Sequence, residues 1–295
     1  MRWNGCATVA DRLRGVAPAK VNFVLEVTGV RRDGYHEIDT ILQALELADD
    51  VVVEFGALPG VSVDGRFAAG TPADESNLAW RAAEILAARC GAAVDDLAIT
   101  LHKRIPAAGG LGGGASDAAT VLQLLGRHWG ASSEVIAEVA NAVGSDPAFF
   151  VAGGGTARAR GRGEAVTPLP DVLRQPVVLF VPESTIERKT ARMFAALDRV
   201  PFDDGSVSEA FARRAPGLVT PAEIHNGFER VAFDLFPGLA ALWEELESRT
   251  GEAIHLAGAG PTLFWVGGDS AAAAIAQAGA GLSCAVIRTT TRSRR

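Results

Sequence analysis

The first part of the chain alternates apolar and polar positions, which is typical of half-buried strands. Residues 16–27 place apolar side chains at every second position, so that Lys20 and Asn22 share the opposite face. Two more segments of high strand propensity follow an Arg-Asp-Gly turn, at residues 38–47 and 50–55. This order predicts an antiparallel sheet.

The middle of the chain alternates helical and strand patterns. The expected helices span residues 77–90, 115–129 and 132–143, and the expected strands span 97–103, 156–160 and 165–169. Ser76 is the predicted N-cap of the first helix, and Gly91 stands where its C-terminal glycine is expected. An N-terminal unit is predicted to close near residue 170.

The second half begins with a continuous apolar run, PVVLFVP at residues 176–182, which predicts a buried strand. Helical patterns follow at 187–197, 208–214, 221–233 and 238–250, and the chain ends with strands at 253–256, 262–266 and 284–289 and a helix at 269–278. Such an ending is typical of a split βαβ unit. The sequence therefore predicts an α+β fold with two domains, residues 1–170 and 171–295.

Composition narrows the class of protein. The 295 residues are 48% hydrophobic and 21% charged. The absence of an apolar run of about 18 residues favours a globular protein over a membrane protein. The net charge of -7 argues against a general nucleic-acid binder, because neutralising phosphates requires a basic face. The short basic tail RTTTRSRR at residues 288–295 is expected to be solvated.

The cysteines and the first residues bear on location. Cys6, Cys90 and Cys284 are scattered and form no CxxC pair, so neither a disulfide framework nor a zinc site is indicated. The first 15 residues lack the apolar core of a secretory signal and are expected to form a ragged extension. These features favour a cytoplasmic location.

The strongest chemical signal is IPAAGGLGGGASDAAT at residues 105–120, where five glycines in six positions precede helix-forming residues. Glycine permits positive φ and close approach of a ligand, and a helix start presents free N–H groups and a positive dipole end. The segment predicts a phosphate loop, although it lacks the GK[ST] of a Walker loop and the spacing of a dinucleotide fingerprint. A flexible turn between strand and helix is the alternative.

Asp146 is unusual because the segment around it, residues 144–155, is otherwise apolar apart from Ser145. Carboxylates are seldom fully buried without a partner, so Asp146 is either a functional group or a cap and turn residue. Pro147 follows it directly and favours an extended geometry for Asp146.

Three segments together resemble the GHMP kinases: PAKVNFVLEVTGVRRDGYHEIDT, IPAAGGLGGGASDAA and HLAGAGPTLFWV. The resemblance covers nearly the whole chain. It implies a two-domain GHMP kinase fold, with a ribosomal protein S5 domain 2-like N-terminal domain and a ferredoxin-like C-terminal domain. DGYH, the most specific part, resembles the branch that uses ATP and Mg²⁺ to phosphorylate the 2-hydroxyl of a cytidine diphosphate-linked methylerythritol in non-mevalonate isoprenoid biosynthesis.

The resemblance also implies roles for individual residues. Asp146 would be the base facing the substrate hydroxyl, with Lys20 as the cation beside it. The substrate would be held by Asn22, Tyr35, His36 and Phe194. ATP would be held by Asn77, Lys103, Pro106, Gly109, Gly110, Leu111, Gly112, Gly113, Gly114, Ala115 and Ser116. No metal ligand is assigned, and Ala115 departs from the family's usual serine.

Three of these residues have an alternative structural interpretation, and the chain as a whole has two alternative functions. Lys20 is alternatively a solvated strand lysine, His36 a turn histidine and Phe194 a core aromatic. Another GHMP kinase acting on homoserine or a mevalonate has no use for a base-stacking DGYH segment. A catalytically inactive nucleotide-binding regulator would be marked by loss of Lys20 or Asp146, and both are present. The expected partner is a small-molecule substrate, without nucleic acid or membrane, and the expected assembly is a monomer or homodimer.

Overall fold

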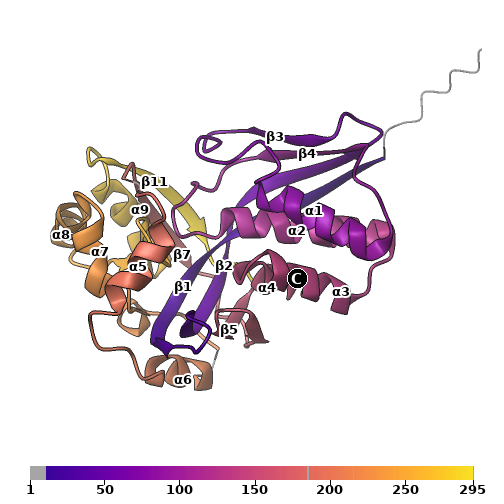
Figure 1. Ribbon diagram of the computed structural model, residues 1–295. Helices are drawn as coiled ribbons and strands as arrows, with labels where there is room; N and C mark the ends of the chain where they lie inside the picture. Colours follow the sequence, from indigo (N-terminus) through magenta and orange to yellow (C-terminus); the bar gives the residue numbers. More distant parts are fainter. Residues whose placement is uncertain (1–10, 185, 215, 295) are drawn as a thin grey trace, which may run out of the picture.

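The computed structural model describes residues 11–184, 186–214 and 216–294, and these fold around two sheets (Figure 1). The larger sheet has seven strands in the described part of the chain and runs in the order β3-β4-β2-β1-β8, with β5 and β6 continuing from β2. Its strands are β1 (Arg12–Val30), β2 (His36–Phe55), β3 (Gly60–Asp64), β4 (Leu97–His102), β5 (Thr156–Gly161), β6 (Ala165–Pro168) and β8 (His225–Asn226).

β1 and β2 pair antiparallel along almost their full lengths and form the spine of this sheet. The predicted antiparallel sheet is therefore confirmed, but the two segments predicted at 38–47 and 50–55 form one continuous strand. The alternating pattern breaks at Asp49, which is fully buried because it pairs with Lys103 from a distant segment. Because a buried charged residue does not fit the strand pattern, the sequence pattern divided β2 into two segments.

Helices cover one face of the larger sheet. They are α1 (Leu78–Cys90), α2 (Gly113–Trp129), α3 (Ser133–Val143) and α4 (Asp146–Val151). α2 contacts β1, β2 and the other three helices, so it is the centre of this layer. The predicted cap at Ser76 is wrong by one residue: Asn77 accepts from the Ala79 N–H, whereas the Ser76 hydroxyl donates to Asp74.

Over the ranges that the structure describes, the second sheet has four antiparallel strands in the order β11-β7-β10-β9. These are β7 (Pro176–Pro182), β9 (His255–Leu256), β10 (Leu263–Val266) and β11 (Cys284–Thr290), accompanied by α5 (Lys189–Leu197), α7 (Glu229–Leu235), α8 (Leu239–Thr250) and α9 (Asp269–Ala278). Phe180, Trp265 and Met193 lie in the core between sheet and helices. The predicted buried strand and α+β class are confirmed.

One helix predicted in the second half is wrong. Residues 221–233 form a 3-10 turn (Pro221–Glu223), β8 and the start of α7 rather than one helix. The Asn226 side-chain amide donates to Leu256 O and Gly258 O, and its oxygen accepts from Phe228 N. These bonds hold the chain extended, so that β8 adds to β1 in parallel.

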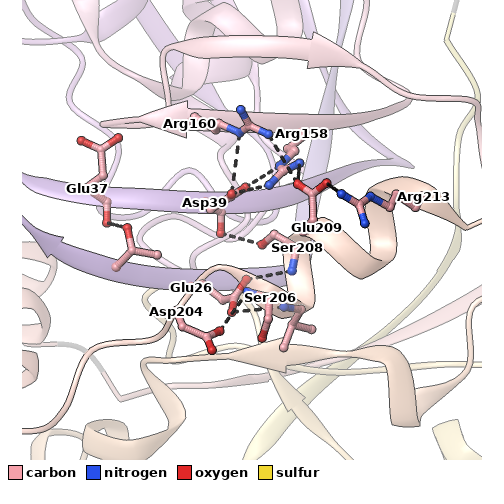
Figure 2. A network of polar contacts seen from close by, with 12 residues as sticks. Glu26, Glu37, Asp39, Arg158, Arg160, Asp204, Ser206, Ser208, Glu209 and Arg213 are labelled. Atoms are coloured by element: carbon pink, nitrogen blue, oxygen red, sulfur yellow. Dashed lines mark hydrogen bonds and ion pairs between the residues drawn. The ribbon is translucent and has the colours of Figure 1, made fainter.

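A polar network joins the second half of the chain to the larger sheet (Figure 2). Arg158 on β5 donates to both carboxylate oxygens of Asp39 on β2, at 2.7 and 2.6 Å, and to Glu209 on α6 (Ser206–Arg213) at 2.6 Å. The Ser208 N–H donates to buried Glu26 on β1 at 2.8 Å. These contacts join residues on either side of position 170. The predicted domain boundary at that position stays a prediction.

The chain ends also differ from expectation. The tail predicted to be solvated is packed: Thr291 is 2% exposed and Arg292 is 8% exposed, and the Arg292 N–H donates to Ala44 O. Residues 12–15 of the predicted 15-residue extension belong instead to β1. The first ten residues of the chain, with Cys6, lie outside the described residues.

Candidate active site

A cavity of about 1230 Å³ lies where the three sequence motifs meet. A pocket for one drug-sized ligand is about 300 to 1,000 Å³, so this cavity has room for more than one small molecule. Its wall contains nearly all of the predicted site residues: Lys20, Asn22, Tyr35, His36, Asn77, Lys103, Pro106, Gly109, Gly110, Leu111, Gly112, Gly113, Gly114, Ala115, Asp146 and Phe194. Ser116 lies behind the wall and is fully buried.

The phosphate loop connects β4 to α2. Gly110 has φ 85° and Gly112, the N-cap of α2, has φ 73°, so the predicted positive φ is confirmed at these two glycines. Gly112 offers no side chain to cap the helix, and the N–H groups of the first turn have no intrahelical acceptor. The helix start therefore presents donors and a positive dipole end that suit an anion.

The loop is held from both sides. The Lys20 N–H on β1 donates to Leu111 O at 2.9 Å. A Cβ on Gly110 would overlap the carbonyl of Ala257, in the third sequence motif. Residues 257–260 form a turn after β9, named here the second glycine turn, in which Gly258 and Gly260 have positive φ. The loop is thus wedged between the spine of the larger sheet and a turn from the smaller one.

A buried ionic cluster lies beneath the loop. The Lys103 ammonium pairs with both Asp49 and Asp117, and all three residues are at most 1% exposed. The second Asp49 oxygen accepts from the backbone N–H groups of Arg104, at 2.5 Å, and Ile105, at 2.8 Å. Burial raises the pKa of Asp117 to about 7, although the Lys103 ammonium favours its ionised form. Lys103 lines the cavity, but its charge is paired with these two carboxylates, and its predicted contact with ATP stays a prediction.

Lys103→Met is expected to destabilise the protein by about 3–5 kcal/mol, since it leaves buried carboxylates without their cation. Chemical denaturation measures this loss.

Asp117→Asn leaves Lys103 paired with Asp49 and should therefore destabilise the protein less than Lys103→Met. A carboxyl whose pKa rises on folding lowers stability as pH increases from its unfolded pKa to about 7, so Asp117→Asn should flatten the stability profile over that window. An unchanged profile would contradict this assignment.

Lys20 and Asp146 lie next to each other on the cavity wall. Lys20 Nζ lies 3.8 Å from Asp146 Oδ2; the lysine is buried, whereas the carboxylate is 44% exposed. Lys20 Nζ donates to Asn22 Oδ1 at 2.9 Å, and Asn22 Nδ2 donates to Thr40 at 2.8 Å. Three consecutive polar contacts therefore fix the lysine and leave the carboxylate accessible.

The expectation that Pro147 makes Asp146 extended is wrong. Asp146 is the first residue of α4, and Pro147 occupies its first turn. A missing N–H costs nothing there, because the first N–H groups of a helix have no intrahelical acceptor. α4 thus begins at the cavity with its only carboxylate.

Another part of the cavity wall is aromatic. The His36 and Phe194 rings stack with centroids 4.5 Å apart, and His36 Nε2 lies 2.8 Å from Asp198 Oδ1. Tyr35 is 56% exposed, and its ring lies 4.9 Å from the Arg162 guanidinium carbon. The sequence missed Asp198 and Arg162, which belong to no motif and become neighbours of the DGYH segment only in the fold.

Comparisons with known proteins agree with this geometry. The family model of the GHMP kinases N terminal domain matches residues 77–154. Proteins named 4-diphosphocytidyl-2-C-methyl-D-erythritol kinase are similar to this chain: one from Dehalococcoides mccartyi is 40% identical and covers 84% of this chain and 87% of its own. Another, from Saccharopolyspora erythraea, is 34% identical and covers 92% of this chain and 88% of its own.

Solved structures extend the comparison to the fold. A crystal structure of 4-(cytidine 5'-diphospho)-2C-methyl-D-erythritol kinase has a TM-score of 0.73 and 31% identity, and covers 95% of this chain and 99% of its own. Mevalonate kinase from Methanococcus jannaschii has a TM-score of 0.68 at 12% identity, covers 97% of this chain and 100% of its own, and shares the fold. The two-domain fold expected from the motifs is confirmed.

Proposed function

The chain belongs to the GHMP kinases, in the 4-diphosphocytidyl-2-C-methyl-D-erythritol kinase family, and on this premise we propose that it phosphorylates 4-diphosphocytidyl-2-C-methyl-D-erythritol on its 2-hydroxyl. It is an ATP-dependent kinase of non-mevalonate isoprenoid biosynthesis. One observation carries the assignment: Lys20 and Asp146 lie in one cavity between a phosphate loop and an aromatic end.

The two ends of the cavity suit two different ligands. The phosphate loop and the start of α2 suit the phosphates of ATP, with Asn77 on the same wall. Tyr35, with the stacked pair His36 and Phe194, suits the flat cytosine ring, because unpaired bases are bound by stacking on aromatic side chains. The methylerythritol between them then faces Asp146.

The transfer uses Asp146 as the proton acceptor. Its carboxylate takes the proton of the 2-hydroxyl as that oxygen forms a bond to the γ-phosphorus, and the bond from phosphorus to the bridging oxygen of ATP breaks to leave ADP. Lys20, held by Asn22, orients the carboxylate toward the cavity by its charge.

The oxygen atoms beneath the loop fit a Mg²⁺ ion. Ser116 Oγ and Asp117 Oδ1 are buried without a hydrogen-bond partner in the described structure, and both residues lie near the start of α2. The described residues contain no cluster of three metal-binding side chains, which suits Mg²⁺ held mainly by ATP phosphates and water. Ser116 and Asp117 would hold the ion, which neutralises phosphate charge when bound.

Location and assembly follow from the same proposal. No helix in the described ranges is long and apolar enough to cross a membrane. We place the enzyme in the cytoplasm, where its ATP and small-molecule substrate are dissolved, as a monomer or homodimer without nucleic-acid or membrane partners.

ADP formation with three acceptors tests the function. With ATP and Mg²⁺, the protein should turn over the cytidylyl substrate and leave homoserine and mevalonate unreacted. Preferential turnover of either of those acceptors would assign another GHMP activity, and ATP binding without turnover of any acceptor would assign a nucleotide-binding regulator.

Tyr35→Ala is expected to raise KM for the cytidylyl substrate roughly 5- to 150-fold, the scale of one base–aromatic stacking contact of about 1 to 3 kcal/mol. The loss should appear in KM rather than in kcat, because binding energy at the cytidine is mostly uniform between ground and transition states. KM for ATP should stay nearly constant, because other residues bind it in this proposal. Tyr35 is 56% exposed, so its removal should leave the fold intact.

Tyr35→Phe is the matched control, since it keeps the ring face and should cost little. CDP should compete with the substrate and lose affinity for the alanine variant by a similar factor. A rise in KM for ATP alone would place Tyr35 on the nucleotide side and contradict the cytidine assignment.

A further inference from the structure

Lysine is rare in this chain and is confined to one place. Of the 28 lysine and arginine residues, three are lysine, namely Lys20, Lys103 and Lys189. All three line the same cavity. All remaining residues of these two types are arginine. Lysine, whose ammonium is compact and can lose its proton, is therefore found at the cavity alone. Lys20 and Lys103 have roles above, whereas Lys189 belongs to no sequence motif.

Lys189 reaches across the cavity from the other half of the molecule. It is the first residue of α5, and its Nζ donates to Ala108 O of the phosphate loop at 2.6 Å and to Gly260 O of the second glycine turn at 2.5 Å. Both acceptors are neutral backbone carbonyls. Lys20 and Lys103 each pair with a carboxylate, but across the described ranges Lys189 has none within ion-pair distance.

Backbone strain marks both sides of this contact. Among the described residues, the non-glycine residues with left-handed φ are Ala108, at 56°, and Arg188, at 50°. Ala108 provides the carbonyl that Lys189 binds, and Arg188 is the N-cap that aims Lys189 into the cavity. Such conformations cost about 1–3 kcal/mol each and concentrate at ligand clamps and active sites.

The charges that face Lys189 leave an excess of positive charge. They are Lys20 on β1 and Asp146 on α4, while the phosphate loop and second glycine turn present carbonyls. Burial and then repulsion by Lys20 lower the pKa of Lys189 to about 8, and Asp146 opposes this effect. Asp146 pairs with Lys20 alone, so the second ammonium group has no carboxylate partner, and a bound phosphate would balance its charge.

We propose that Lys189 is a phosphate ligand of the transfer site, whose ammonium leaves the carbonyls of Ala108 and Gly260 to bind a phosphate oxygen of the reactants. This inference rests on the proposed function. The oxygen belongs either to the phosphoryl group in transit or to the diphosphate of the cytidylyl substrate, and steady-state kinetics separates these two sources.

Four variants isolate the charge of Lys189. Lys189→Met removes both the charge and the donors, Lys189→Gln keeps a donor for the carbonyls without charge, and Lys189→Arg keeps the charge. Arg192→Gln is the matched control, because Arg192 is an exposed cation on the same helix and outside the cavity. Thermal unfolding of each variant checks the fold. If Lys189→Met does not fold, the comparison of Gln with Arg carries the test.

The expected result is a large loss in the Met and Gln variants alike, with partial recovery in Lys189→Arg. If Lys189 contacts the phosphoryl group in transit, its loss should lower kcat roughly 10²- to 10³-fold with KM nearly constant. If Lys189 contacts the substrate diphosphate, its loss should instead raise KM and the Kd of CDP roughly 10- to 150-fold. Activity in Lys189→Gln close to that of Arg192→Gln would overturn the proposal and leave Lys189 as a structural clasp.

The pH dependence of kcat/KM provides a second test, because a purely structural role of Lys189 would not affect it. Lys189 is charged below its pKa of about 8 and neutral above it, so kcat/KM should fall as pH rises through that value. Lys189→Arg stays charged and should lose this limb. A limb that persists in the Arg variant would contradict the proposal. An inactive wild-type protein would instead refute the proposed function, so the two failures are distinguishable.

Discussion

Asp146→Asn is expected to lower kcat by roughly 10² to 10⁴ while ATP binding is retained, which is the usual contribution of a general base. The amide keeps the size of the side chain but cannot take the hydroxyl proton. The side chain is 44% exposed and its one ion-pair partner among the described residues is Lys20, so little stability depends on it. Steady-state kinetics and ADP titration measure the two effects separately.

Asp269→Asn is the matched control, because Asp269 is an exposed aspartate that also begins a helix, α9. It should leave kcat unchanged. A loss in Asp146→Asn near the lower bound would indicate that the carboxylate mainly orients the hydroxyl, since positioning and electrostatics carry much of phosphoryl transfer. An unchanged kcat would make Asp146 a helix-start residue without a catalytic role.

Gly110→Ala is expected to weaken nucleotide binding roughly 100-fold or more. At φ 85° an alanine is strained, and its Cβ would overlap the Ala257 carbonyl. Left-handed strain of about 1–2 kcal/mol and overpacking of about 1–3 kcal/mol together displace the loop from the helix start that it serves. Calorimetric titration with ADP measures the loss.

Gly130→Ala separates strain from displacement. Gly130 ends the same helix with φ 70°, and a Cβ there meets nothing within 4 Å. It should lower stability slightly and leave ADP affinity unchanged. Tight ADP binding by a folded Gly110→Ala variant would refute the phosphate-loop assignment.

The local sequence pattern correctly predicted the elements that depend only on residues close together in the sequence. The alternation in β1, the periodicity of α1 and the strand, loop and helix around Gly112 were all predicted and are present. These features depend on neighbours in the sequence. The family motifs then placed Lys20 and Asp146 in one site, and the structure brings them to 3.8 Å.

The errors occur where distant segments decide. Asp49 interrupts the strand pattern, and only Lys103 in a later segment explains its burial. Asn226 breaks a helical pattern because its amide binds carbonyls of the second glycine turn and the strand before it. Lys189 could not be found from sequence for the same reason, since its two acceptors come from different segments.

The most direct test of the account is ³¹P NMR of the product formed from ATP and 4-diphosphocytidyl-2-C-methyl-D-erythritol. The carbon that bears the 2-hydroxyl also carries the methyl branch and has no hydrogen. The account therefore predicts one new phosphomonoester resonance without three-bond splitting by a proton, together with ADP in equal amount. A resonance split by protons on the ester carbon would place the phosphate on another hydroxyl. No new resonance under conditions where ATP is bound would contradict the assignment of this chain as the kinase.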